Sequence, residues 1–283
     1  MNTVTYNGTP ILYTEGSSGG SGDETWLAKT WNGFRDIRGS YVWTDGVNIY
    51  YSYSASSDQY ILDKATSTWS SKTWNGYTGV NGNGVWTDGE NIYYSNSSSQ
   101  YVLDKATSTW SAKTWNGYSN MEGPYVWTDG DNIYYSYNAT QKVLDKATST
   151  WSTKTWNGLT SFSGDNIWTD GENIYYSSDA TQKVLDKATS KWSTKTWNGL
   201  TSFSGGNIWT DGENIYYSKG SSQYVLDKAT STWSAKTWKG YTRLNGSQTW
   251  TDGENIYWSN GTGGQYVLNK PTPSSSFAIY YNP

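Results

Sequence analysis

The stretch "IWTDGENIYYS" occupies residues 167–177 and is repeated, letter for letter, at 208–218. Near-copies of it lie at 42–52, 85–95, 126–136 and 249–259. The Asp-Gly pair in the middle suits a hairpin turn, because Gly tolerates a positive φ. The residues after the turn, "NIYYS", suit a strand with two different faces. Each copy is therefore predicted to form a strand, a turn and a second strand.

Two series of tryptophans recur with the same spacing. The first contains Trp43, Trp86, Trp127, Trp168, Trp209 and Trp250, and the second contains Trp31, Trp74, Trp115, Trp156, Trp197 and Trp238. Both have intervals of 43, 41, 41, 41 and 41 residues. A period of this length with four short strands is typical of β-propeller blades, and no helical i, i+3, i+4 pattern accompanies it. The predicted fold class is all-β: a propeller of four-stranded antiparallel blades, forming a single domain over residues 1–283.

One copy shows the expected strands. Residues 84–88 form strand a, 91–95 strand b, 101–104 strand c and 109–115 strand d. The Asp-Gly pair joins strands a and b, and the turn "KATS" joins strands c and d.

The ends of the chain bear on the number of blades. Tyr281 lies where a closing aromatic residue is due after Trp238, so "SSFAIYYNP" is expected to supply strand d of the sixth copy. "TYNGTPILYT" aligns with the hairpin stretch, and "ETWLAKTW" (24–31) aligns with strand d. These matches favour seven blades: a degenerate first blade over about 1–31, and six repeats of about 41–43 residues over 32–283. The alternative is six blades, in which 24–31 closes the sixth blade and both tails are accessory.

The segment "LDKATSTW" carries a family likeness. The spacing of Asp104, Thr107 and Trp110 resembles the Asp-x-x-Thr-x-x-Trp stretch of kelch-repeat β-propellers. The likeness spans all six copies, roughly residues 40–270, although the double glycine of kelch repeats is replaced here by "YYS". The chain also resembles kelch-like repeat proteins encoded by tailed phages. Kelch propellers bind many unrelated partners, so the resemblance implies the fold and leaves the function open.

Composition limits the partners. The 283 residues include no Cys, no His, three Arg and seventeen Lys, with a net charge of −4. Nucleic acids and anionic membranes call for basic patches, and no apolar run is long enough to span a membrane. The start of the sequence lacks the features of a signal peptide. We expect neither nucleic-acid binding nor membrane insertion. A virion or extracellular location is expected, with the cytoplasm as the alternative.

Catalytic residue types are scarce. Without His and Cys the chain can form no Ser-His-Asp triad, cysteine nucleophile or His-ligated metal site. Asp88, Glu90 and Asn91 cluster at a turn that offers too few oxygens for Ca²⁺, and we interpret them as turn residues. The sequence therefore predicts no cofactor, no metal and no enzymatic activity. A glycan hydrolase that uses paired carboxylates is the alternative, although near-identical copies make one asymmetric active site hard to place.

Aromatic residues dominate the apolar part of the sequence. There are 19 Trp and 26 Tyr, and each such side chain can bury about 150–250 Å². Few Leu, Ile and Val are available to fill a core, so the aromatic residues are expected to pack between blades. A repeat lectin with one aromatic platform per blade is the alternative.

The loops that differ between copies mark the candidate binding face. Strands alternate in direction, so the d–a and b–c loops share one face, and the nearly invariant a–b and c–d turns share the other. One d–a position is always apolar and is expected to pack near the mouth of the channel: Ile37, Val80, Met121, Phe162, Phe203 and Leu244. The positions around it vary, as binding loops on a constant scaffold do. The candidate ligand-binding residues are Arg35, Asp36, Arg38, Asn81, Asn120, Glu122, Arg243 and Asn245. Neutral drift on an exposed face is the alternative.

The function predicted from these observations is non-catalytic recognition of a protein or glycan through the d–a and b–c loops, as part of a phage tail, a virion or a cell surface. A purely structural assembly protein and a carboxylate-based glycan hydrolase are the alternatives.

Overall fold

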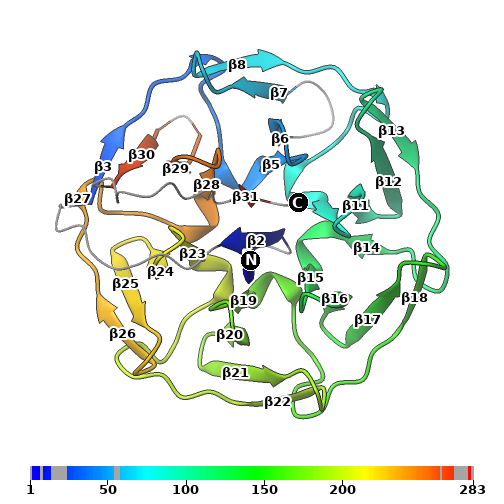
Figure 1. Cartoon of the computed structure of the whole chain (residues 1–283), viewed down its shortest axis with the longest axis vertical. Helices are drawn as coiled ribbons and strands as arrows, with labels where there is room; N and C mark the ends of the chain where they lie inside the picture. Colours follow the sequence, from blue (N-terminus) through cyan, green and yellow to red (C-terminus); the bar gives the residue numbers. More distant parts are fainter. Residues whose placement is uncertain are drawn as a thin grey trace.

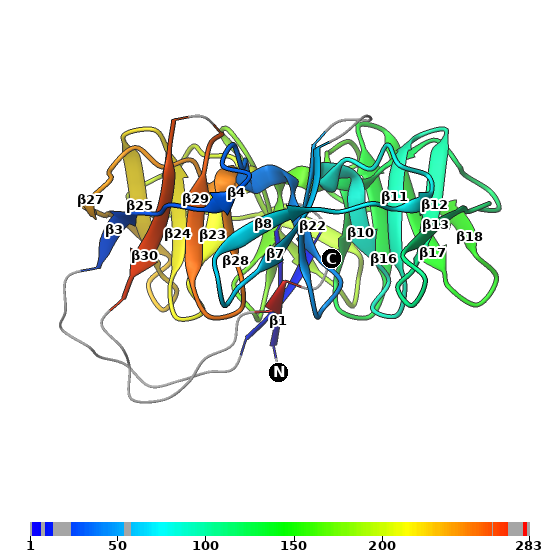
Figure 2. The same cartoon turned by 90° about the horizontal axis from the view of Figure 1, so that it is seen from above.

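The computed structural model describes residues 2–6, 9–13, 24–53, 58–261, 263–270 and 280–281. Across these residues, six four-stranded antiparallel blades stand around a central axis (Figure 1). Seen from the side, the ring of blades is a flat disc (Figure 2). The predicted all-β propeller is therefore confirmed as a fold class. Within the described residues, the helices are single 3-10 turns.

Each blade runs from an inner strand a to an outer strand d. Blade 1 contains β5 (Val42–Thr44), β6 (Ile49–Tyr53), β7 (Asp58–Asp63) and β8 (Thr68–Ser71); blade 2 contains β10 (Val85–Thr87), β11 (Ile92–Ser97), β12 (Ser99–Asp104) and β13 (Thr109–Ala112). Blade 3 contains β15 (Val126–Thr128), β16 (Ile133–Tyr137), β17 (Thr140–Asp145) and β18 (Thr150–Thr153); blade 4 contains β19 (Ile167–Thr169), β20 (Ile174–Ser178), β21 (Thr181–Asp186) and β22 (Lys191–Thr194). Blade 5 contains β23 (Ile208–Thr210), β24 (Ile215–Lys219), β25 (Ser222–Asp227) and β26 (Thr232–Ala235); blade 6 contains β28 (Thr249–Thr251), β29 (Ile256–Ser259), β30 (Gln265–Asn269) and β3 (Thr25–Ala28).

Short elements connect the blades. Two-residue strands, β4 (Asn32–Gly33), β9 (Asn75–Gly76) and β27 (Lys239–Gly240), run parallel to the outer strand of the following blade, and β14 (Met121–Glu122) pairs with β11. Six 3-10 turns precede the inner strands in the described chain: η1 (Gly39–Tyr41), η2 (Gly82–Gly84), η3 (Gly123–Tyr125), η4 (Gly164–Asn166), η5 (Gly205–Asn207) and η6 (Gly246–Gln248).

The number of blades corrects the sequence-based preference. Strand β3 pairs antiparallel with β30, with Trp26 opposite Leu268, and so closes the sixth blade. Strand β31 (Tyr280–Tyr281) instead pairs with β2 (Thr9–Tyr13), which pairs with β1 (Asn2–Tyr6). This three-stranded sheet lies at the centre of the ring, with β1 against β19 and β2 against β15 (Figure 1). The preference for seven blades, with a degenerate blade over 1–31, is wrong, and the six-blade alternative is right. The segment "GSSGGSGD" lies outside the described residues.

The reason for the error is physical. A strand-d pattern shows that a segment can cover the free edge of a strand c, but the pattern is the same whichever strand c it covers. In "ETWLAKTW" the pattern is met, and the edge that it covers belongs to the last copy. Because β3, near the start of the chain, and β30, near its end, belong to the same blade, the hydrogen bonds between these two strands close the ring.

Tryptophan triads form the core between neighbouring blades. Trp43 of blade 1 stacks on Trp74, with ring centroids 5.6 Å apart, and Trp110 of blade 2 meets both rings edge-on at 5.9–6.0 Å. Edge-to-face and offset-stacked geometries are the favourable ones for aromatic pairs. The same triad recurs at every interface in the described ring: Trp86, Trp115, Trp151; Trp127, Trp156, Trp192; Trp168, Trp197, Trp233; Trp209, Trp238, Trp26; and Trp250, Trp31, Trp69. All of these rings are buried, so these tryptophans pack between blades as predicted.

Two repeated series of lysines form hydrogen bonds between neighbouring blades. In one series, the Lys after strand c donates to the backbone of the preceding blade's a–b turn, as Lys146 Nζ does to the Asp88 carbonyl at 2.7 Å. In the other, the Lys after strand d donates to a Ser of the next blade's c–d turn, as Lys113 Nζ does to Ser149 Oγ at 2.9 Å.

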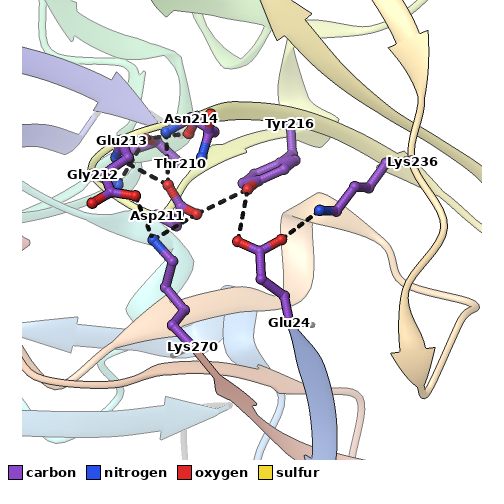
Figure 3. A network of polar contacts seen from close by, with 9 residues as sticks. All are labelled: Glu24, Thr210, Asp211, Gly212, Glu213, Asn214, Tyr216, Lys236 and Lys270. Atoms are coloured by element: carbon purple, nitrogen blue, oxygen red, sulfur yellow. Dashed lines mark hydrogen bonds and ion pairs between the residues drawn. The ribbon is translucent and has the colours of Figure 1, made fainter. Parts of the chain in front are cut away.

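Both series change at the interface between blades 5 and 6, where the ring closes. Glu24 stands where the other blades carry that Ser, and Lys236 pairs with its carboxylate. Lys270 binds the Asp211 carboxylate at 2.8 Å and that of Glu213 at 3.5 Å (Figure 3). Burial lowers the pKa of Lys270, but the carboxylates of Asp211, Glu213 and Glu24 together outweigh burial and hold that pKa above its usual value. Ion pairs of two lysines therefore replace neutral hydrogen bonds where no c–d turn joins the strands; we refer to these ion pairs together as the closure clasp.

The aspartates of the c–d turns link stability to pH. In each of these turns an Asp carboxylate accepts a hydrogen bond from a Thr hydroxyl three residues later, as Asp104 does from Thr107 at 2.7 Å. This bond holds the pKa below its usual value at Asp63, Asp104, Asp145, Asp186 and Asp227. A carboxyl group whose pKa is lower in the folded chain stabilises folding above its unfolded pKa. That contribution is lost as the pH falls through the folded pKa.

We therefore expect the free energy of unfolding to be nearly constant between about pH 5 and 8 and to fall below about pH 4. Urea denaturation at a series of pH values measures it. The Thr107→Val variant loses one hydroxyl donor and should show a shallower decline. A stability that rises between about pH 4 and 2.5 would contradict the linkage.

Candidate functional site

An Asp carboxylate recurs in the a–b turn of every blade, and it accepts hydrogen bonds from groups of its own hairpin. Asp88 Oδ1 accepts the backbone N–H groups of Glu90 at 3.0 Å and Asn91 at 2.7 Å, and its Oδ2 accepts the Tyr93 hydroxyl at 2.9 Å. Burial raises the pKa of Asp88, but these donors outweigh it and the pKa lies below its usual value. Gly89 follows with φ +93°, as a tight turn requires. The turn interpretation of this motif is confirmed.

The d–a and b–c loops form the opposite surface, here called the loop face. A glutamine at or near the start of strand c ties the two loop sets together. Gln182 Nε2 donates to the Asp179 carbonyl in its own b–c turn and to the Phe203 carbonyl in the following d–a loop, at 2.7 and 3.1 Å. Equivalent bonds run from Gln59, Gln100, Gln141, Gln223 and Gln265. The d–a and b–c loops therefore share one face, as predicted, and are held together.

The apolar side chain of each d–a loop is buried under the loop and packs between two blades. Ile37, Val80, Met121, Phe162, Phe203 and Leu244 are all 2% exposed or less, and each packs in one of the clusters between blades. Their predicted role in inner packing is confirmed. The variable residues on either side are thus displayed from a fixed backbone.

A closed ring of 3-10 turns surrounds the axis next to these anchors. Each turn in the described chain contacts its neighbours, and η6 contacts η1. The first residue of every turn is Gly because a side chain does not fit: a Cβ on Gly164 would lie 2.3 Å from the Tyr125 carbonyl oxygen. The ring fixes the position of the second and third residue of each turn, which vary between copies.

The predicted site residues all lie on the loop face, in the loops that lead into blades 1, 2, 3 and 6. Arg35, Asp36, Arg38, Asn120, Arg243 and Asn245 are exposed, and Asn81 and Glu122 are half-buried. They are spread around the ring and do not converge on one pocket.

Some of these side chains have structural partners. Asn81 Oδ1 accepts the N–H of Asn83 at 3.1 Å, and Asn245 Oδ1 accepts the N–H of Gly220 at 3.0 Å. Arg38 lies over the ring of Tyr53. The side chains of Asn81 and Asn245 therefore stabilise the conformation of their loops. The exposed side chains that remain as candidates for binding are those of Arg35, Asp36, Asn120 and Arg243.

Tyrosines on the loop face were missed by the sequence analysis, which assigned the aromatic residues to packing. Tyr137 ends β16 and is 42% exposed, beside Tyr125 of η3 at a centroid distance of 4.5 Å. Tyr53 and Tyr41 form the equivalent pair in blade 1. The signal was present in the copies: the residue after "IYYS" is Tyr in two copies and changes in the others.

One carboxyl group in the ring of 3-10 turns is electrostatically unusual. Asp165 is the second residue of η4, and burial raises the pKa of its side chain. Ser, Asn, Pro or Gly occupies this position in the other turns. The second positions of the six turns therefore carry a single ionisable side chain, that of Asp165.

Among the described residues, no group of three or more Asp, Glu, His or Cys side chains is arranged to hold a metal ion. No helix in this part of the chain has the length and apolarity needed to cross a bilayer.

No family model matches the sequence, and no curated protein does. Among solved structures, the chain is similar to the extracellular domain of a protein assigned to the hybrid two-component systems of B. thetaiotaomicron. The sequence identity is 13% and the TM-score is 0.49, over 96% of this chain and 40% of the other. This chain thus spans less than half of that neighbour's length, and the likeness says nothing about function.

Proposed function

We propose that this propeller is a non-catalytic recognition module that binds a protein or glycan partner through its loop face. One observation carries the proposal. On the opposite face the repeated polar residues are engaged in the same internal contacts from blade to blade. On the loop face, loops held by a repeated glutamine hydrogen bond display side chains that differ at equivalent positions. A rigid scaffold with variable exposed side chains is the usual basis of recognition.

A matched pair of variants tests this role. The Arg35→Ser/Arg243→Ser variant changes two exposed residues of the loop face, and the Glu90→Ser/Glu254→Ser variant changes two exposed residues of the a–b turns. Partners are first identified with glycan arrays and cell-surface protein panels. We expect the loop-face variant to bind an identified partner at least about tenfold more weakly, since one charged contact is worth roughly 1.4 kcal/mol or more.

The control variant should bind like the wild type. A partner that both variants bind equally well, or that only the control variant loses, would place recognition elsewhere. Turnover of chromogenic glycosides by the wild type would contradict the non-catalytic role.

A role in a larger assembly extends the same proposal. The kelch-like motif and the resemblance to phage-encoded repeat proteins are its support, and a receptor-binding appendage combines structure with recognition. Tail or capsid genes beside the gene of this protein would favour a virion component.

A further inference from the structure

A pair of tyrosines occupies the loop face at two of the six equivalent places. In blade 1, Tyr41 ends η1 and Tyr53 ends β6, with ring centroids 4.8 Å apart. In blade 3, Tyr125 ends η3 and Tyr137 ends β16, with centroids 4.5 Å apart. At the other four places the two positions hold Gly84 and Asn96, Asn166 and Ser178, Asn207 and Lys219, and Gln248 and Asn260.

The blade 1 pair carries a cation from its own chain. The guanidinium carbon of Arg38 lies 4.8 Å from the centroid of the Tyr53 ring, and Arg38 Nη1 donates to the Tyr53 hydroxyl at 3.4 Å. The Arg38 side chain reaches this place across Gly261 in the b–c turn of blade 6. A guanidinium over an aromatic face is a favourable cation–π arrangement, and its flat shape allows stacking. Blade 1 therefore contains an occupied guanidinium site.

The blade 3 pair has a carboxylate where blade 1 has this cation. Glu122 stands at the position of Arg38, and its carboxylate accepts the hydroxyl of Ser97 in the neighbouring b–c turn at 3.4 Å. Among the described residues, no Lys or Arg lies over the Tyr137 ring; Lys142 of β17 lies over Tyr118 instead. The Tyr137 ring is left 42% exposed.

The charge around the blade 3 pair has the sign that attracts a cation. Glu122 is the N-cap residue of η3, the turn that ends in Tyr125, and η4, which carries Asp165, contacts η3. Burial raises the pKa of the Tyr125 hydroxyl, and the carboxylates of Asp165 and Glu122 raise it further. In blade 1 the equivalent residues are the neutral Asn83 and the cationic Arg38. Two tyrosine rings and two carboxylates thus stand together at one place on the loop face.

We propose that Tyr125, Tyr137, Glu122 and Asp165 form a binding site for an arginine side chain presented by a protein partner. The site has two tyrosines at the places of Tyr41 and Tyr53, although its rings are tilted by 33° where those of blade 1 meet edge-on at 71°. It supplies carboxylates where blade 1 has the Arg38 guanidinium over Tyr53. A carboxylate beside the stacked guanidinium offers charge-assisted hydrogen bonds, which arginine accommodates better than lysine does. The inference rests on the recognition role proposed above and narrows the partner to a protein with an exposed arginine.

The test uses a blocked Gly-Arg-Gly peptide and its citrulline counterpart, which has nearly the same shape without the charge. Binding to the whole protein is followed by the shifts of assigned backbone amide NMR signals. We expect the arginine peptide to shift the signals around Tyr125 and Tyr137. The affinity for the citrulline peptide should be lower by at least about tenfold, as the loss of a cation–π contact with charge pairing implies.

Two exchanges between blades sharpen the test. The Glu122→Arg variant should place an internal guanidinium over Tyr137, as in blade 1, and abolish the response. The Arg38→Glu variant should uncover Tyr53 and add a second, weaker set of shifts there. The Glu122→Gln variant keeps the shape of the side chain and should weaken binding without blocking the site. Thermal unfolding of each variant confirms that it is folded.

Equal binding of both peptides, or an unchanged response in the folded Glu122→Arg variant, would overturn the arginine site. So would shifts around Tyr137 produced by methyl glycosides and not by the arginine peptide, since they would indicate a sugar platform. The peptide response does not depend on the biological partner. The Arg35→Ser/Arg243→Ser variant should retain the peptide response even if it loses that partner, so failure of this site and failure of the recognition role are distinguishable.

Discussion

Replacing Trp26 by alanine is expected to lower the free energy of unfolding by about 3–5 kcal/mol, the usual cost of removing a buried tryptophan. Trp26 is 1% exposed, and it meets Trp209 and Trp238 edge-on with centroids 5.8 and 5.9 Å away. It belongs to β3, which the structure places at the outer edge of blade 6. Its removal would leave a cavity between blades 5 and 6 where the two ends of the chain meet.

Chemical denaturation of matched variants measures this effect. Trp110→Ala removes the equivalent ring from blade 2, where the chain is continuous, and should cost a similar amount. Leu27→Ala changes a neighbouring residue of β3 that is 47% exposed and should cost less than about 0.5 kcal/mol. If Trp26→Ala were as mild as Leu27→Ala, β3 would be a dispensable tail and not the closing strand.

Removal of the Lys270 ammonium is the second large expected effect, because it opens one half of the closure clasp. The Asp211 side chain is fully buried and its carboxylate lies 2.8 Å from Lys270 Nζ. The Lys270→Gln variant leaves a buried carboxylate without its cation, and we expect a loss of about 1–3 kcal/mol in the free energy of unfolding. The loss should persist in moderate salt because buried pairs are screened less than exposed ones.

The matched control is Lys228→Gln, one blade earlier. Lys228 occupies the equivalent position but donates to a backbone carbonyl, that of Asp170, at 3.4 Å. Its replacement should cost less than about 1 kcal/mol, as expected for a long hydrogen bond to a neutral group. Urea denaturation measures the loss in each variant. Equal losses would show that the Lys270 ion pairs stabilise the interface between blades 5 and 6 no more than the neutral hydrogen bond of Lys228 stabilises its own interface.

Much of the fold followed from local patterns. The hairpin stretch and the tryptophan series predicted blades with their strands within a few residues of the observed ones: residues 84–88 were expected as a strand and Val85–Thr87 is one. Such predictions succeed because turn chemistry and the alternation of faces act over only a few residues. The buried anchors of the d–a loops, such as Met121, were found in the same way, from a position that stays apolar in every copy.

The candidate site was predicted less completely. The face and its exposed arginines followed from the comparison of copies, but Arg38 was grouped with Arg35 although its guanidinium is engaged with Tyr53. The tyrosine pairs were missed because a Tyr in a strand rich in Tyr looks like packing until its neighbour is known. Tyr137 and Tyr125 are twelve residues apart in the chain, and only the ring of 3-10 turns brings their rings together.

The sequence by itself determined the repeat, the strands within it, the tryptophan core and the face on which the copies differ, because each depends on residues within one period or on the alternation of faces. The tertiary structure alone decided which segment closes the ring, where Lys270 and Glu24 find their partners, and which tyrosine pair has an internal cation. These features join residues up to 244 positions apart, as the pairing of Thr25 with Asn269 on β3 and β30 shows. Contacts of that kind depend on how the whole ring closes, and no local pattern specifies it.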